Sequence, residues 1–218
     1  MRKAIILTML VASTLFSQAQ KIQGGLKIST NINWLKSNVS TYSNDGLRLG
    51  WGWGVFADYQ LTKNYYFAPS LEFLYNGVNL LISDTLYDQH TKYHLNYVSL
   101  PLTIKMKTNQ IGYFKFFGQF GIDPSFMIKG MADIETDSTL VNASSIQNDV
   151  NIKSQMFPLR LGLVVGLGCE YNFVGNTSLV ASLTFNNGFI NILKNSDATK
   201  IDEQANSHYM ALNVGIIF

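Results

Sequence analysis

The chain contains few charged residues. Only 14% of its 218 residues are Asp, Glu, Lys or Arg, whereas roughly 25% is usual for a soluble domain. Hydrophobic residues make up 47% and aromatic residues 13%, a composition too apolar for a disordered chain. The sequence therefore predicts one folded domain, part of whose surface is covered by something other than water.

Cysteine and long apolar runs are scarce as well. Cys169 is the only cysteine, which excludes an internal disulfide and a lipid-modified cysteine after an export signal. No stretch beyond the N-terminal segment approaches 18 consecutive apolar residues, so no transmembrane helix is predicted. Without a basic stripe, nucleic acid is not an expected partner. Phosphate-loop, paired-cysteine and dinucleotide motifs are missing too, so we predict no catalytic, cofactor-binding or metal site.

The first 19 residues have the pattern of a secretory signal peptide. Two basic residues precede an apolar run, residues 4–16, and Ser17-Gln18-Ala19 is a small-x-small cleavage site. We therefore expect cleavage after Ala19 and a mature domain over residues 20–218. Because the leader holds two of the 16 basic residues and none of the 14 acidic ones, the mature domain would carry no net charge.

The mature sequence alternates between apolar and polar residues, the pattern of strands whose two faces meet different environments. Aromatic residues gather toward strand ends, as in the interfacial girdles of membrane barrels. The connections alternate between three tight turns and four longer loops, which include residues 77–92, 130–155 and 187–207. The alternating segments cover residues 21–34, 47–61, 65–76, 97–106, 114–123, 160–170, 178–186 and 209–218.

This pattern predicts an all-β fold, an eight-stranded antiparallel transmembrane β-barrel with short periplasmic turns and long extracellular loops. We place it in the outer membrane of a Gram-negative bacterium, surrounded by lipid, with both termini facing the periplasm. A soluble β-sandwich also alternates, but it has no reason to alternate short and long connections.

Charged residues recur on the predicted inward faces. They are Lys27, Arg48, Asp58, Glu72, Lys105, Lys115, Asp123, Arg160 and Glu170. An eight-stranded barrel is just wide enough for side chains, so these groups should pair across the lumen and close it. We expect one periplasmic layer, and above it Glu72 with Arg48 or Arg160. The expected periplasmic layer consists of Asp58, Lys105, Lys115 and Glu170. A small gated pore through the same charges is the alternative.

Five short segments resemble the PorT-type family of small outer-membrane β-barrels (outer membrane protein beta-barrel domain). They are Ser17-Gln18-Ala19-Gln20, Gly24-Gly25-Leu26-Lys27, Pro69-Ser70-Leu71-Glu72-Phe73, Tyr97-Val98-Ser99-Leu100-Pro101-Leu102 and the terminal Phe218. The resemblance implies a barrel whose relatives include a branch associated with type IX protein secretion. It also implies partners among outer-membrane or periplasmic proteins. The function we predict is a non-enzymatic binding module or an accessory subunit of a secretion or assembly complex.

Two chemical alternatives remain open. A lipid-modifying enzyme would need a nucleophile and a base near the outer rim, but Ser207 and His208 are adjacent and should point to opposite faces of a strand. His90 and His94, with Asp84 and Asp88, are a candidate metal site in the loop at 77–92, although their spacing matches no required geometry. Polar loops on a rigid scaffold remain the expected working surface.

Overall fold

The computed structural model describes residues 22–37, 42–44, 46–83, 87–138, 143–153, 156–175, 177–191 and 205–218. The predicted signal peptide and its cleavage site lie outside these residues. Within these ranges, no helix has the length and apolarity needed to cross a bilayer. The strands are β1 (Ile22–Ser37), β2 (Tyr42–Asn44), β3 (Arg48–Gln60), β4 (Tyr65–Ser83), β5 (Tyr87–Ser99), β6 (Leu102–Lys107), β7 (Phe114–Ser138), β8 (Ala143–Asn151), β9 (Leu159–Val174), β10 (Thr177–Gly188) and β11 (Ala205–Ile217).

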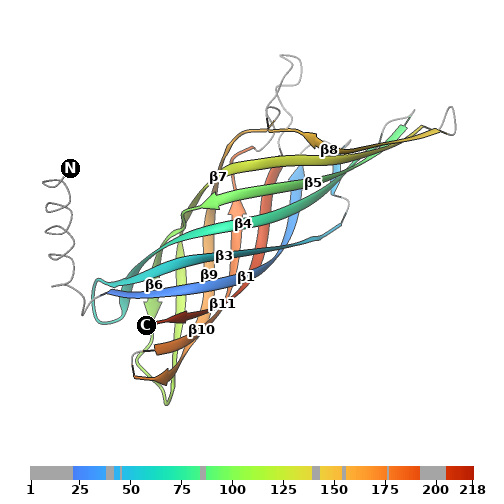
Figure 1. The fold of residues 1–218 in the computed structure, drawn as a ribbon. Helices are drawn as coiled ribbons and strands as arrows, with labels where there is room; N and C mark the ends of the chain where they lie inside the picture. The colour runs from blue at the N-terminus through green and yellow to red at the C-terminus, as the bar shows by residue number, and fades with distance from the viewer. Residues whose placement is uncertain are drawn as a thin grey trace, which may run out of the picture.

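Eight antiparallel barrel strands, which we call staves, close into a barrel, which confirms the predicted fold (Figure 1). Strands β5 and β6 together form one stave between β4 and β7. They are interrupted at Leu100 and Pro101, because proline has no N–H to give to the ladder. The seam joins β1 to β11, with Gly25 opposite Ile217 and Ser37 opposite Ala205.

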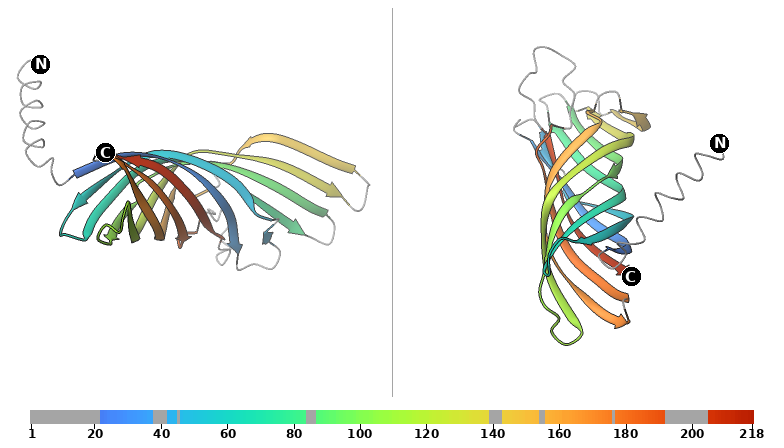
Figure 2. Two further views of the ribbon diagram at one scale, coloured as in Figure 1. Left: turned by 90° about the horizontal axis from the view of Figure 1, so that it is seen from below. Right: turned by 90° about the vertical axis from the view of Figure 1, so that its left-hand side faces the viewer.

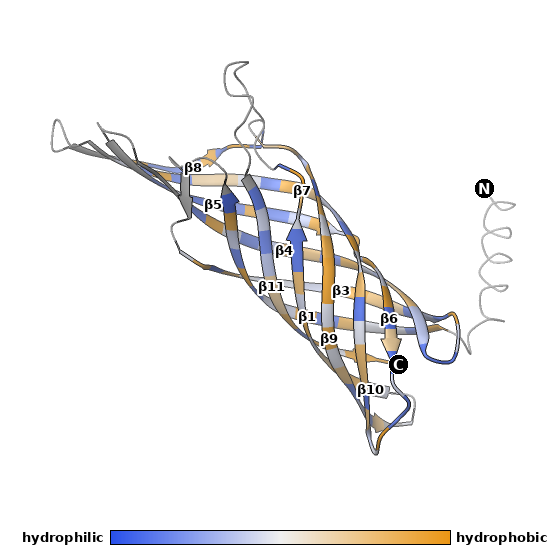
Figure 3. Cartoon of the chain, turned by 180° about the vertical axis from the view of Figure 1, so that it is seen from behind, coloured by the Kyte–Doolittle hydropathy of each residue, from blue (hydrophilic) through white to orange (hydrophobic). Residues whose placement is uncertain are grey.

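Side chains alternate between the lumen and the outside along every stave, so polar and apolar colours alternate in Figure 3. Along β10, for example, Val180, Ser182 and Thr184 are buried in the lumen, whereas Leu183 is 50% exposed on the outer face. The outer face thus carries a continuous apolar band, with Trp51 stacked on Tyr75 and Trp53 on Phe73. A surface this apolar fits lipid contact rather than water.

The two rims of the barrel differ. The near rim holds the short turns at 61–64 and 108–113 and Gly175 at the end of β9, together with the start of β1 and the end of β11. At the far rim, β4, β5 and β7 run on beyond the barrel, and β2 and β8 pair with them. Figure 2 shows this extension leaving the barrel on one side. We call it the outer sheet.

The outer sheet corrects the predicted loops at 77–92 and 130–155. It consists of β2, residues 77–83 of β4, 87–96 of β5, 130–138 of β7, and β8. These segments were predicted as loops because, outside an apolar environment, a strand needs no alternation of polar and apolar residues. The third expected loop shrinks at both ends, since β10 reaches Gly188 and β11 begins at Ala205.

Candidate functional site: the lumen and the outer sheet

A buried ion-pair cluster crosses the lumen near the rim that carries the short turns. Asp58 accepts a hydrogen bond from Lys105 at 2.9 Å and forms an ion pair with Lys107 at 2.7 Å. Lys107 also forms an ion pair with Glu170 at 2.6 Å. All four side chains are at most 5% exposed. Phe56 and Phe117 fill the space beside this near charge layer, with the Lys105 ammonium 5.3 Å and 4.7 Å from their ring centres.

The near charge layer contains three of the four residues expected there, and Lys107 takes the position expected for Lys115. Lys115 lies opposite Glu170 in the β7–β9 register. It is only half-buried at the start of β7, and no described carboxylate is within ion-pair distance of it. Lys107 shares its inward face with Lys105, but the predicted strand ended at Met106. Extending the alternation by one residue would have found it.

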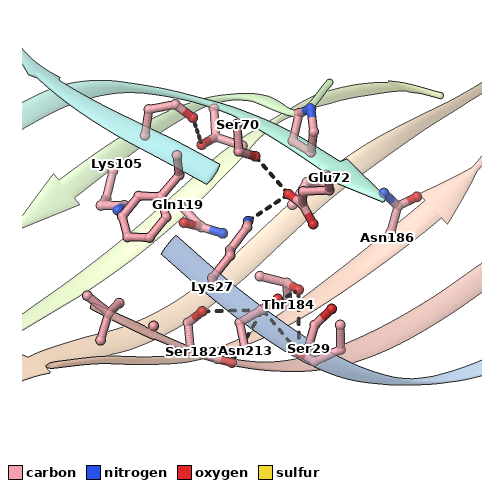
Figure 4. Close-up of a pocket in the computed structure, with 18 of the residues that line it drawn as sticks. Lys27, Ser29, Ser70, Glu72, Lys105, Gln119, Ser182, Thr184, Asn186 and Asn213 are labelled. Atoms are coloured by element: carbon pink, nitrogen blue, oxygen red, sulfur yellow. Dashed lines mark hydrogen bonds and ion pairs between the residues drawn. The ribbon is translucent and has the colours of Figure 1, made fainter. Parts of the chain in front are cut away.

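A second ion pair, between Lys27 and Glu72, lies above the near layer. The two charged atoms are 2.6 Å apart, and the Ser70 hydroxyl donates to the same carboxylate at 2.7 Å (Figure 4). Lys27 and Glu72 are both in register with Gly54 on the strand between them. Because Gly54 has no side chain, the two long side chains meet over it. The expected partnership of Glu72 with Arg48 or Arg160 is therefore wrong.

A cavity separates this pair from the facing wall of the barrel. Its lining includes Lys27, Glu72, Ser182, Thr184 and Asn213, and Figure 4 shows the polar side chains converging on it from several staves. Asn213 donates to the Thr184 hydroxyl at 3.1 Å. Phe56, Leu74, Phe117 and Val180 also line the cavity, so its wall is partly polar and partly apolar. Charge layers lie on both sides of it along the barrel axis.

The far charge layer is built around Asp123. Its carboxylate pairs with Arg160 at 3.2 Å and accepts from the Tyr209 hydroxyl at 3.2 Å and from the Asn186 amide. The Arg160 guanidinium also lies 4.9 Å from the ring centre of Tyr209. Asp123 is fully buried. Sequence reasoning placed Asp123 and Arg160 inward but missed Asn186 and Tyr209, whose hydrogen bonds depend on the register of β10 and β11.

Apolar side chains fill the lumen around the far charge layer and beyond it. Ile152 and Met156, from the segment after β8, are each 3% exposed, and the Ile152 N–H donates to Gly130 at 3.2 Å. They pack into a buried cluster that we call the apolar cap. Its other members are Leu35, Leu74, Val78, Leu95, Tyr97, Met127, Ala132, Tyr209 and Ala211.

Arg48 lies outside this network, which corrects its predicted place in the lumen. A Cβ atom added at Gly77, on the outer face of β4, would collide with the Arg48 side chain. Arg48 therefore crosses β4 on the outside, where it donates to Asn79 at 3.3 Å and lies 3.2 Å from a His94 ring nitrogen. The inward direction failed because Arg48 is the first residue of β3, where the end of the strand leaves its side chain room to turn.

His94 links Arg48 to Asp133 on the neighbouring strand. The His94 ring lies 3.1 Å from the Asp133 carboxylate, which also accepts the Asp149 N–H at 2.9 Å. That backbone hydrogen bond, together with the one from His94, holds the pKa of Asp133 below its usual value. Asp149 has a positive φ of 56° at a bulge between β7 and β8.

The other residues considered for chemistry stay apart. His90 and His94 lie in β5 rather than in a loop, and four residues of strand separate them by about 13 Å, too far to share a metal ion. Asp84 lies outside the described residues, and within them no group of three potential ligands could hold a metal. Ser207 and His208 lie on opposite faces of β11, and neither ring nitrogen of His208 has a hydrogen-bond partner in the part of the chain that the structure describes.

Comparisons with known proteins give the same architecture, an outer-membrane β-barrel. A family profile described as "Outer membrane protein beta-barrel domain" matches residues 16–194. The outer membrane protein OprG from Pseudomonas aeruginosa is 10% identical with a TM-score of 0.51, over 90% of this chain and 94% of that chain. Neisserial surface protein A is 13% identical with a TM-score of 0.48, over 90% and 95%. At 10% identity, the likeness to OprG shows the fold alone. No protein of curated function matches the sequence.

Proposed function

The chain belongs to the outer membrane protein beta-barrel domain family, and we propose that it acts as a non-enzymatic binding module with a closed lumen. As in other barrels of the outer membrane, the near rim with the short turns faces the periplasm. The outer sheet then projects outside the cell. The observation that carries the proposal is this combination of a lumen blocked at several levels and a sheet that extends past the lipid.

The blocked lumen argues against transport. The near charge layer, the Lys27–Glu72 pair and the far charge layer lie one above another, and the apolar cap packs around and beyond the last of them. Opening a path would break buried ion pairs, and each broken pair costs about 3–5 kcal/mol. Barrels of eight staves normally have interiors filled by side chains. A gated pore is therefore the weaker candidate.

Enzymatic activity also has little support from the described residues. His94 and Asp133 form a base-like pair on the outside of the barrel, but a hydrolase would also need an aligned nucleophile. Ser207 faces away from His208, so the pair considered from the sequence cannot work together. The outer sheet, in contrast, offers an edge strand, β8, that pairs only with β7 among the described strands. Such an edge can accept an extended segment of another protein.

An accessory role in a secretion or assembly complex follows as the finer form of the proposal. It is supported by the resemblance to the PorT-type family and by the accessible β8 edge. In this role, the barrel anchors the outer sheet, and the sheet contacts another outer-membrane component or an exported protein.

The test combines conductance with cross-linking. A photoreactive amino acid replaces Ile146, which is 64% exposed on β8, and the control position is Phe116, which is 50% exposed on the apolar band. After irradiation of cells and purification in mild detergent, we expect a discrete protein adduct at position 146 and none at position 116. Planar-bilayer recordings of the purified protein should show no steady conductance. A large steady conductance together with no adduct would refute the proposal.

A further inference from the structure

Basic side chains gather on one wall of the barrel, just beyond the apolar band. They are Arg48 on β3, Lys92 on β5, Lys129 on β7 and Lys153 after β8. The three lysines are exposed, and Arg48 is half-buried beside His94. We call these four residues the basic belt. Asp133 contacts the belt through His94.

The strand register fixes the height of the belt. Tyr75, which stacks on Trp51 at 4.3 Å between ring centres, is opposite Asn96, and Asn96 is opposite Lys129. Two residues further from the near rim, His94 stands beside Gly77, over which Arg48 lies. Another two residues further is Lys92. The positive charges thus begin level with the outer aromatic pair and continue for two steps of about 7 Å each.

These lysines are available to a ligand. Among the described residues, no carboxylate lies within ion-pair distance of Lys92, Lys129 or Lys153. Lys153 instead donates a hydrogen bond to the carbonyl of Ile128 at 3.2 Å. Its ammonium therefore lies beside the backbone of the residue that precedes Lys129. The same wall also carries Asp133, which is opposite Lys92, and Glu135, which lines the same surface hollow as Lys92. On β7, Asp133 and Glu135 lie four and six residues beyond Lys129, so the positive charge is least compensated at the end of the belt next to the apolar band.

We propose that the basic belt binds the phosphate groups of anionic lipids in the outer leaflet. Aromatic side chains at the end of an apolar band sit at the level of lipid headgroups, so a lipid whose chains lie against Trp51, Tyr75 and Ile128 has its phosphate beside the belt. Ammonium and guanidinium groups form strong charge-assisted hydrogen bonds with phosphate. A soluble polyanion would have no use for the adjoining apolar surface, which favours a lipid.

The experiment measures lipid retention by the full-length mature protein in nonionic detergent. The purified protein is titrated with phosphatidylglycerol or with phosphatidylcholine, and bound lipids are counted by native mass spectrometry. The test variant is K92Q/K129Q. The matched control is K36Q/K63Q, which removes the same charge from exposed positions at the far rim of β1 and in a near-rim turn. Because all four lysines are exposed, both variants should fold, which heat-dependent migration in gels checks.

We expect the wild-type protein to retain phosphatidylglycerol in preference to phosphatidylcholine. K92Q/K129Q should bind phosphatidylglycerol about 25-fold more weakly, since each lysine near an anionic surface contributes roughly fivefold, and the control should stay within about twofold of wild type. Equal retention of the two lipids, or equal losses in both variants, would overturn the proposal. Displacement of the lipid by millimolar inorganic phosphate would also overturn it, because the site would then bind free anions.

Discussion

Removing the Asp58 carboxylate should destabilise the barrel through one uncompensated lysine. Asp58 is fully buried between Lys105 at 2.9 Å and Lys107 at 2.7 Å. At 2.9 Å and an effective dielectric constant of about 20, one such contact is worth roughly 6 kcal/mol before desolvation is counted. In Asp58→Asn, Lys107 keeps Glu170 at 2.6 Å, so only Lys105 loses its ion-pair partner. We therefore expect a loss of about 3 kcal/mol, the lower end for a broken buried pair.

The assay is reversible urea unfolding of the protein refolded into lipid vesicles, followed by tryptophan fluorescence. The double variant Asp58→Asn/Lys105→Met removes both partners and should recover most of the loss, because no unpaired charge is then buried. Lys63→Gln, at an exposed turn position, should change the unfolding free energy by less than about 0.5 kcal/mol. If Asp58→Asn also falls within about 0.5 kcal/mol of wild type, the lumen is hydrated at this level and the reasoning is refuted.

Two further predictions concern single backbone positions. Gly54→Ala should lower the unfolding free energy by about 2 kcal/mol in the same assay, because the added Cβ would lie 2.9 Å from the Glu72 Cα. Gly24→Ala, where an added Cβ would have nothing within 4 Å, should be neutral or slightly stabilising. Equal effects of the two variants would contradict the crowding at Gly54. Asp149→Val should lower the opening free energy of β8 by about 1–2 kcal/mol, because a β-branched residue disfavours a φ of 56°. Asp149→Asn should be tolerated. Hydrogen exchange of the β8 amides measures both effects, and equal protection in the two variants would count against the bulge.

The sequence predicts the barrel well because each stave separates two environments. Leu179, Ala181 and Leu183 face outward while Val180, Ser182 and Thr184 face the lumen, and such alternation is visible without coordinates. The same signal fails in the outer sheet. There β8 offers Ser145, Gln147 and Asn148, whose exposed side chains leave no apolar face to detect. Cross-strand pairing, which no local pattern records, makes that segment a strand.

The candidate site was predictable as a set of residues but not as a set of pairs. Alternation gives the face of most charged residues, so Asp58, Lys105 and Glu170 were grouped correctly from the sequence, although Arg48 was not. Which charges meet depends on the relative heights of neighbouring staves, and small residues change the answer. Glu72 contacts Lys27 across Gly54, which has no side chain. Arg48 lies outside the lumen because Gly77 leaves room for its side chain. Neither partnership is encoded in the spacing of the charges.

The seam between β1 and β11 has a consequence for how the chain matures. Leu26 is in register with Ile216, so the first stave to be synthesised keeps an open edge until the last has been made. Contacts this distant in sequence slow folding and expose unpaired strand edges to aggregation. The polypeptide therefore has to be kept apart from its neighbours from export until closure, and it can leave that protection only when its two ends meet.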